Sequence, residues 1–471
     1  MALLSSCFIL FMLAPGAHAQ ATSETQKIQD ALAEQQKVIQ ALQEALAAQQ
    51  KKLDELKSAP TNPPVPAAPK AATTAAPPAT ASPTASAPKI EAAKPIPAAP
   101  KWYEKYSFRG YTQVRHNRVV STNPLLACDQ CDRNLGNNTN LSIRRARFIL
   151  SGDITDRIYI YFQPDFASTS GTLHFGQVRD LYFDIALDKK KEFRIRAGQS
   201  KVPYGFENMQ SSQNRLALDR NDALNSAVSN ERDMAAFFYW APAKIRQRFT
   251  TLNAVGPTGL KGSGDYGVIG MGVYNGQTAN RPEANNNMHY VARVTYPWQL
   301  KSGQYIEASL QGYTGRSTIT SDLRSAGTRG TPDFTYSDRR VAATFVYYPQ
   351  PFGFQTEWTV GKGPEYDPTT RTIQNKTLRG GYAQTMFMKK IHGQVITPFY
   401  RFQYYKGGKK FELDARRYLV RDHELGVEWQ ANSNLELVGM YSRNDRTFED
   451  GGRPNNRQQG HLFRLQLQVN Y

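Results

Sequence analysis

The sequence has 471 residues, a net charge of +18 and only three cysteines. These values exclude a small disulfide-stapled domain and an acidic disordered chain. After the N-terminal segment, no apolar run reaches the roughly 18 residues that a spanning helix requires, so we exclude a helical membrane protein.

The first residues have the features of an export signal. An apolar stretch at 8–14 (FILFMLA) precedes Pro15, and Ala17 and Ala19 form a small-x-small cleavage pattern before Gln20, although no Lys or Arg precedes the stretch. We therefore predict a signal peptide over 1–19 and an exported mature protein.

The next segment has a heptad pattern. Apolar residues and glutamines recur at alternating spacings of four and three from Ile28 to Leu56, which predicts a coiled coil over 20–57. Leucine dominates the core positions, where dimers usually prefer β-branched residues, so a trimer is favoured. The alternative is one amphipathic helix lying on another domain. Residues 58–100 are almost entirely Ala, Pro, Thr, Ser and Lys, and predict a semi-extended linker.

From residue 101 the pattern changes to alternating apolar and polar side chains in segments of about ten residues, separated by turns or polar loops. In 192–198 (EFRIRAG), for example, apolar side chains would face one way and charged side chains the other. The chain ends on Tyr471, an aromatic residue closing an unbroken amphipathic segment, which a soluble β-sandwich would rarely show. We therefore predict an all-β transmembrane barrel over 101–471.

The number of strands decides whether the barrel can conduct. Bacterial barrels have even strand numbers, so we predict about 16 antiparallel strands, which would leave a water-filled lumen and make transport the expected function. One strand lies within 233–254, either at 234–240 or at 244–253. Residues 203–232 either fold into the lumen as a constriction loop or form an external loop. The other candidate strands are 108–116, 141–151, 157–166, 177–187, 192–199, 264–275, 288–297, 304–313, 339–348, 352–361, 378–388, 394–405, 420–430, 434–443 and 461–471.

Arginines are the candidate ligands of the lumen. All 34 lie after residue 100, and arginine keeps its charge and binds phosphate or carboxylate through a planar fork. Clean alternation points Arg194 and Arg196 inward, and we expect Asp180 to pair with an arginine. Alternatively, basic residues outside these two contact lipopolysaccharide phosphates at the membrane surface. The further inward candidates are Arg109, Arg144, Arg145 and Arg147, of which the adjacent pair needs a bulge, and Arg246 and Arg248 if 244–253 is a strand.

Catalytic and metal-binding patterns are not apparent. Cys128 and Cys131 fall in a long loop between the first two predicted strands, where an oxidising compartment favours a local disulfide. No second CxxC or nearby histidine completes a zinc site, and GxSxG, HExxH and Gly-rich phosphate loops do not occur. We therefore predict no metal, no cofactor and no enzymatic activity.

Four segments carry a resemblance to a known family, the phosphate-selective porins O and P of Gram-negative outer membranes. The segments are 106–115 (YSFRGYTQVR), 143–152 (IRRARFILSG), 194–207 (RIRAGQSKVPYGFE) and 219–221 (DRN), in this order. The resemblance implies a homotrimer of sixteen-stranded barrels with an inward third loop, an arginine ladder and a lysine-containing anion site at the constriction.

The resemblance also implies roles for single residues. Arg144 and Arg145 match ladder arginines, Asp180 matches an acidic residue at the constriction, and Arg220 matches a basic residue of the third loop. Where the phosphate-specific members carry a lysine, this chain has Asn208. Anion preference is therefore expected, whereas phosphate specificity is not implied.

These observations together predict a trimeric outer-membrane porin, with its N-terminal segment in the periplasm, that passes small anions such as phosphate by diffusion. The expected partners are these anions, outer-membrane lipid and lipopolysaccharide, the other protomers and, through the coiled coil, peptidoglycan. Two alternatives are a general porin of broad permeability and a tether to peptidoglycan. A receptor-type transporter needs about 22 strands and a plug, for which the chain has no room. A nucleic-acid role is suggested only by the charge, which the barrel explains better.

Overall fold

The computed structural model describes residues 101–122, 141–168 and 174–471, together with Leu126, Asp132, Leu135 and seven isolated positions between Ala33 and Lys51, which are helical. The predicted signal peptide, the core positions of the predicted coiled coil, the linker and the predicted Cys128–Cys131 disulfide lie outside these residues. They remain predictions.

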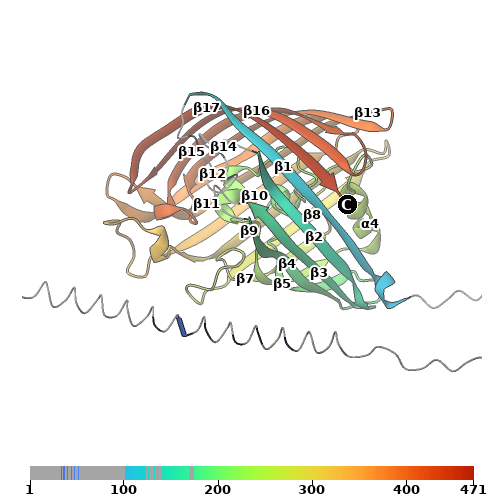
Figure 1. Cartoon of the computed structure of the whole chain (residues 1–471), viewed down its shortest axis with the longest axis horizontal. Helices are drawn as coiled ribbons and strands as arrows, with labels where there is room; N and C mark the ends of the chain where they lie inside the picture. The colour runs from blue at the N-terminus through green and yellow to red at the C-terminus, as the bar shows by residue number, and fades with distance from the viewer. Residues whose placement is uncertain are drawn as a thin grey trace, which may run out of the picture. The chain divides into compact units, whose positions relative to one another are not determined.

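The strands form a single antiparallel sheet that closes into a barrel (Figure 1), because β1 pairs with both β2 and β17. β12 and β13 both pair with β14 and are two parts of one barrel strand, interrupted at Met388. The barrel therefore has 16 strands, which confirms the predicted fold class for this part of the chain. The strands are β1 (Tyr106–Thr122), β2 (Leu141–Thr155), β3 (Ile158–Ser168), β4 (His174–Ala186), β5 (Phe193–Lys201), β6 (Arg232–Trp240), β7 (Ile269–Tyr274), β8 (His289–Gln299), β9 (Tyr305–Thr318), β10 (Thr335–Tyr347), β11 (Phe352–Asp367), β12 (Thr372–Phe387), β13 (Lys389–Ile391), β14 (Gln394–Gly408), β15 (Arg417–Gln430), β16 (Leu435–Asp450) and β17 (Arg453–Asn470).

Alternation along each strand separates the lumen from the outer face. On β15, Glu424 and Glu428 are buried inside the barrel, whereas Leu425 and Val427 are exposed on its outside. Successive side chains point to opposite faces of a strand, so a two-residue period gives the barrel an apolar exterior and a polar interior. In the described part of the chain, no helix has the length and apolar character that crossing a membrane requires.

The region 233–254 contains one strand and one helix. The first alternative, 234–240, is confirmed because it lies within β6, whereas 244–253 forms α4 (Ala243–Leu252) and not a strand. Ile245, Phe249 and Leu252 are its buried residues, and their spacing of four and three is that of a helix face. The alternation of basic residues at Lys244, Arg246 and Arg248 is therefore coincidental.

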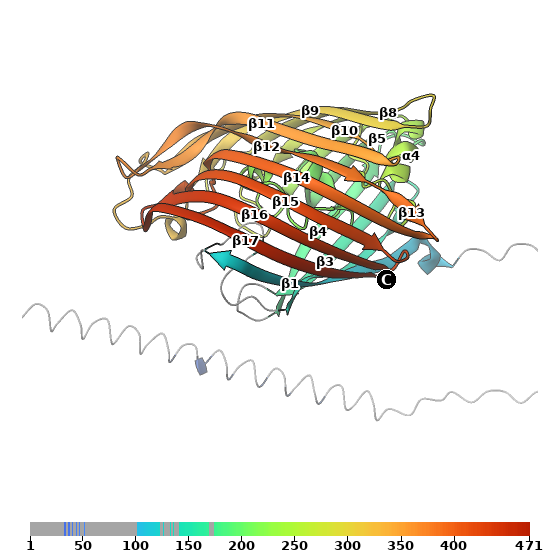
Figure 2. The same ribbon diagram turned by 90° about the horizontal axis from the view of Figure 1, so that it is seen from above.

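The two ends of the barrel differ in the length of their connections. At the end where β1 begins and β17 finishes, here called the terminal end, short turns such as 156–157, 392–393 and 431–434 join the strands (Figure 2). The connection 241–268, which contains α4, is an exception. The opposite end, here called the loop end, has longer connections at 123–140, 202–231, 275–288 and 319–334. In outer-membrane barrels the long loops are extracellular and the short turns periplasmic.

The third loop, 202–231, lies inside the barrel. It contains α2 (Phe206–Met209) and α3 (Asp222–Ala227), and all residues of both helices are buried. α3 begins at Asn221, whose side chain accepts a hydrogen bond from the Leu224 amide. The inward alternative of the sequence analysis is therefore the one observed.

Buried ion pairs attach the third loop to the barrel wall. Arg401 of β14 donates from Nη1 to Glu207 Oε1 (2.7 Å), from Nε to Glu424 Oε2 (2.5 Å) and from Nη2 to the Asp219 carbonyl (2.9 Å). Arg401, Glu207 and Glu424 are all buried, so these ion pairs are shielded from solvent.

We predict that Arg401→Ala loosens the third loop, because removing one partner of a buried ion pair costs about 3–5 kcal/mol. Limited proteolysis of the folded protein in detergent should cleave the loop of the variant much faster than that of the wild type. Lys390→Ala, at an exposed position of β13, is the matched control. Equal cleavage rates for Arg401→Ala and the control would show that this arginine does not hold the loop.

Candidate functional site

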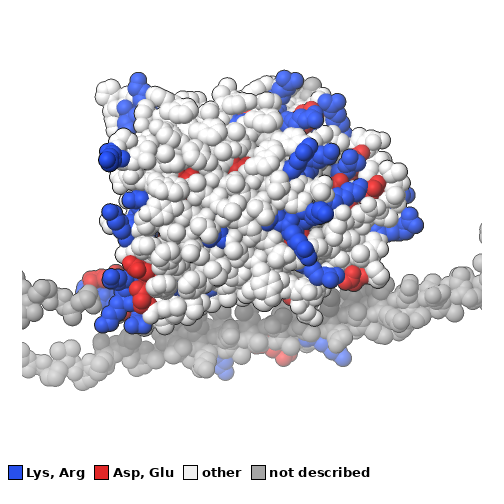
Figure 3. Space-filling view, turned by 180° about the vertical axis from the view of Figure 1, so that it is seen from behind, with Lys and Arg blue, Asp and Glu red and all other residues white. Residues whose placement is uncertain are grey.

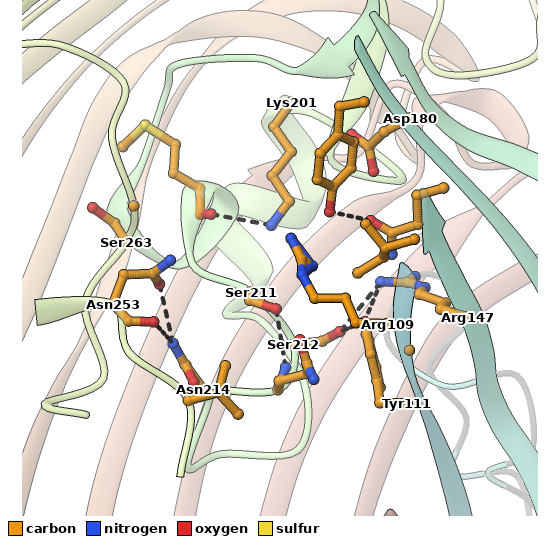
Figure 4. Close-up of a pocket in the computed structure, with 18 of the residues that line it drawn as sticks. Arg109, Tyr111, Arg147, Asp180, Lys201, Ser211, Ser212, Asn214, Asn253 and Ser263 are labelled. Carbon is orange, nitrogen blue, oxygen red and sulfur yellow. Dashed lines mark hydrogen bonds between the residues drawn. The ribbon is translucent and has the colours of Figure 1, made fainter. Parts of the chain in front are cut away.

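A cavity of about 430 Å³ opens in the lumen on the terminal side of the third loop. Figure 4 shows side chains from the strands, the third loop and the connection 241–268 pointing into it. Its wall combines cations with hydroxyl and amide groups. The residues that line it include Arg109, Tyr111, Arg147, Tyr161, Asp180, Arg196, Lys201 and Arg232.

Four arginines occupy successive levels of the lumen along the β1–β2 pair. In the register of the two strands, Arg109 lies opposite Ile149, Tyr111 opposite Arg147, and Gln113 opposite Arg145. Arg115 follows one step further along β1. Because inward side chains recur every second residue, adjacent levels are about 7 Å apart. We call Arg109, Arg147, Arg145 and Arg115 the arginine ladder.

The ladder arginines differ in their neutralisation. Arg109 is exposed to the lumen, with its guanidinium 5.8 Å from the centroid of the Tyr161 ring, and it forms no ion pair with a described carboxylate. Arg147 donates from Nε to Asp165 Oδ2 (2.8 Å) and from Nη1 to Tyr111 Oη (2.7 Å). Arg109, the first arginine of the ladder, is therefore accessible from the lumen, whereas Arg147, the second, is held in place by a carboxylate.

A β-bulge explains how two adjacent arginines share the inner face. The β1–β2 register shifts between Gln113 and Val114, which pair with Arg145 and Ile143, so Arg144 is the extra residue. Arg144 approaches Asp219 at 3.6 Å, whereas Arg145 donates from Nη1 to Gln113 Oε1 (2.7 Å) and has no carboxylate partner among the described residues. Arg145 is thus a buried cation held by a neutral amide.

Arg194 and Arg196 face the lumen, as their alternation predicts. Arg196 forms a two-pronged pair with Asp184, at 2.7 and 2.8 Å, and its guanidinium lies 3.9 Å from the centroid of the Tyr182 ring. Arg194 donates from Nη2 to Asp265 Oδ1 (2.8 Å). Both arginines therefore have carboxylate partners, which weakens their attraction for an ion in the lumen.

Five cations surround one carboxylate at the end of the third loop. Glu231 contacts Arg215 and Arg232 directly, and its oxygens lie 3.5 Å from Arg220 and 4.0 Å from both Arg179 and Lys201. Burial raises the pKa of Glu231, but Arg215, Lys201 and Arg232 outweigh burial and hold that pKa well below its ordinary value. We call these six residues the Glu231 cluster. Asp180 pairs with Arg232 at 2.9 Å, which confirms the expected arginine partner and still leaves a surplus of positive charge.

Asn208, which stands where a lysine is expected, fixes a cation of this cluster. Its Oδ1 accepts a hydrogen bond from Arg220 Nη1 (2.6 Å), and its Nδ2 donates to the Val202 carbonyl (2.8 Å). Burial lowers the pKa of Arg220 to about 10, so the side chain remains charged at neutral pH. The loop therefore keeps one cation at this point through Arg220.

The wall formed by β14 to β16 carries more carboxylates. Two buried cations each meet two carboxylates: Arg401 of β14 contacts Glu207 and Glu424, and Lys261 of the connection 241–268 contacts Glu428 (2.7 Å) and Glu436 (4.0 Å). This wall therefore lacks the surplus of cations that the Glu231 cluster and the unpaired Arg109 and Arg145 give to the side formed by β1 to β6 and the third loop. The lumen is asymmetric in charge.

Not every candidate arginine lies in this region. Arg246 and Arg248 lie on α4, where Arg246 pairs with Asp265 (2.8 Å) and Arg248 donates to the Pro297 carbonyl. Neither lines the cavity, so the expectation that they share a strand face in the lumen is wrong. The helical spacing of the apolar residues around them decides their position.

Sequence reasoning also missed several cations. Alternation from Arg109 along β1 reaches Arg115, which could have been found in this way. Lys201, Arg215 and Arg232 could not, because the course of the third loop brings them to Glu231. In the described residues, no group of three or more His, Cys, Asp or Glu is arranged to hold a metal ion.

Among curated proteins, no relative matches this chain. Solved structures with a similar backbone fold include the following three. They are DcaP of Acinetobacter baumannii (11% identity, 78% of this chain and 97% of that chain, TM-score 0.47), a loop-deletion mutant of OmpT of Vibrio cholerae (9%, 78% and 99%, 0.47) and the anion-selective porin from Comamonas acidovorans (9%, 78% and 99%, 0.46).

The sequence itself gives the family. Residues 127–471 match the profile of the phosphate-selective porins O and P, which is most of the chain and nearly all of the barrel. The resemblance stated from four short segments is therefore confirmed, and the chain belongs to the phosphate-selective porin O and P family.

Proposed function

We propose that this outer-membrane channel conducts small anions, phosphate or a similar ion, by passive diffusion. The arginine ladder carries the proposal. Its four cations lie about two residues apart along one wall, so their positive charges follow one another along the lumen. Conduction requires several sites of moderate strength and not one tight site.

The partial neutralisation of the ladder supports passage without trapping. Asp165 pairs with Arg147, and Asp132 pairs with Arg115 at 2.8 Å. Arg109 and Arg145 have no carboxylate partner among the described residues. Arginines without a carboxylate partner, which should attract an anion more strongly, thus alternate along the ladder with paired arginines, which should attract it less.

The charge asymmetry of the lumen favours anions over cations. The Glu231 cluster faces the same side as the ladder, while the carboxylates of β14 to β16 are paired with buried cations. A wall with a positive surplus raises the local concentration of anions. A general porin of broad permeability would lack this preference.

Arg109 is the first cation to test, because it is exposed and unpaired among the described residues. In planar bilayers under a potassium chloride gradient, the wild type should show an anion-selective reversal potential. Arg109→Glu should lower the anion-to-cation permeability ratio roughly two- to fivefold, since a charge about 4 Å away contributes about 1 kcal/mol in water. Lys389→Glu, at an exposed position of β13, is the control. Cation selectivity of the wild type would contradict the proposal.

Arg145 is expected to determine the affinity for phosphate. Millimolar phosphate should reduce the chloride current of the wild type, because a buried guanidinium that has no carboxylate partner can donate hydrogen bonds to an anionic oxygen. Arg145→Gln should raise the phosphate concentration that blocks half of the current roughly tenfold or more, because the variant loses a hydrogen bond to a charged group. Lys389→Gln should leave the block unchanged. Anion-selective current that phosphate does not block would favour a general anion porin.

We also propose a homotrimer, in which the heptads of 20–57 assemble the N-terminal segments. Support comes from the leucine-rich heptad core of the sequence, which favours three helices over two. Native mass spectrometry of the full-length protein should give three chains, and deletion of 20–57 should increase the monomer fraction at low concentration. A monomeric full-length protein in mild detergent would contradict the proposal.

A further inference from the structure

The outer face of the barrel carries a row of cations near the loop end. Arg339 of β10, Lys362 of β11, Arg379 of β12, Lys406 of β14, Arg421 of β15 and Arg443 of β16 are all exposed, and we call them the outer basic belt. These strands are neighbours in the sheet. Figure 3 shows, on one face, Lys and Arg gathering toward the ends of the barrel, with a broad band between them that carries few charges.

The strand register places like charges directly against each other. Arg339 lies opposite Lys362, and Arg379 lies opposite Lys406. Side chains at directly opposed positions have Cβ atoms about 5 Å apart, and like charges there destabilise a sheet. Lys362 and Arg379 are diagonal neighbours, because Val360 lies opposite Arg379. The belt is therefore continuous over β10, β11, β12 and β14.

Carboxylates do not relieve this repulsion. None of the six belt residues forms an ion pair with a carboxylate in the described part of the chain. Asp445, which lies opposite Arg421 in the register, pairs instead with Arg457 at 3.2 Å. The opposed cations of β10, β11, β12 and β14 thus have no ion-paired carboxylate in the described part of the chain.

The surroundings of the belt identify what supplies the counter-charge. Toward the terminal end the same outward rows continue with apolar residues, such as Val341 on β10 and Val360 and Trp358 on β11, all exposed. Exposed apolar residues on a barrel face hydrocarbon, so the belt lies where the apolar band gives way to the headgroup layer at the loop end. Arginine and lysine at such a boundary bind anionic headgroups.

We propose that the outer basic belt is a binding site for a lipid whose headgroup carries phosphate, in the leaflet at the loop end of the barrel. A phosphate placed between two opposed cations can bind both of them. It would thereby offset the repulsion between Arg339 and Lys362, and that between Arg379 and Lys406. The guanidinium fork can donate hydrogen bonds to two phosphate oxygens at once. The inference needs the outer-membrane location of the barrel and is independent of the selectivity of its pore.

The test compares binding of purified lipopolysaccharide, in phosphatidylcholine nanodiscs, by the wild type and by the fourfold variant Arg339→Gln/Lys362→Gln/Arg379→Gln/Lys406→Gln. The affinity of the variant should fall about tenfold or more, since each basic residue near an anionic surface contributes to binding. Enzymatically dephosphorylated lipopolysaccharide should bind the wild type as weakly as the variant binds the untreated lipid. The control is Lys389→Gln/Lys390→Gln, which removes exposed lysines at the terminal end.

A second measurement separates binding from folding. In vesicles of phosphatidylcholine alone, the fourfold variant should unfold at the same or a higher denaturant concentration than the wild type, because two like-charge pairs are gone. Should this variant not fold, Arg379→Gln/Lys406→Gln serves the same comparison. Equal lipopolysaccharide affinity of variant and wild type, or equal binding of the dephosphorylated lipid, would overturn the proposal. The reversal potentials of the same proteins should be unchanged, so the test of lipid binding is independent of the test of pore selectivity.

Discussion

Closure of the sheet through the pairing of β1 with β17 is the constraint on which the rest of the structure depends. It gives every strand an inner and an outer face, and the register then decides which side chains meet. Inside, charged groups are withdrawn from bulk water and need partners. Outside, only the ends of the strands tolerate charge.

The third loop supplies carboxylates that form ion pairs with several arginines of the inner barrel wall. Glu207 pairs with Arg401 of β14, and Asp219 pairs with Arg115 of β1 and Arg464 of β17, so the loop is held to this part of the barrel wall. A buried ion pair is weak evidence for net stability, but its disruption is costly. The ion pairs therefore specify where the loop lies more than they stabilise the barrel.

Once most charges are paired, the exceptions become informative. Arg109 and Arg145 in the lumen and the outer basic belt on the outside share one property, since none has a carboxylate partner among the described residues. In each place, an anion from outside the chain would neutralise the unpaired positive charge. The mobile ions of the pore and the phosphates of the membrane are thus proposed to bind by the same chemistry.

The sequence alone determined the barrel, the approximate strand number, the inward direction of Arg194 and Arg196 and the family, because each rests on a local two-residue period or a short motif. It could not place α4, since Arg246 and Arg248 alternate as in a strand while Ile245, Phe249 and Leu252 have helical spacing, and packing decides between the two. Only the tertiary structure decided that the third loop enters the lumen and joins five cations around Glu231, and that Arg339 faces Lys362. Except for the contact of Glu231 with Arg232, these contacts join residues that are not adjacent in the sequence, and the register of the strands is fixed by the pairing of all strands together.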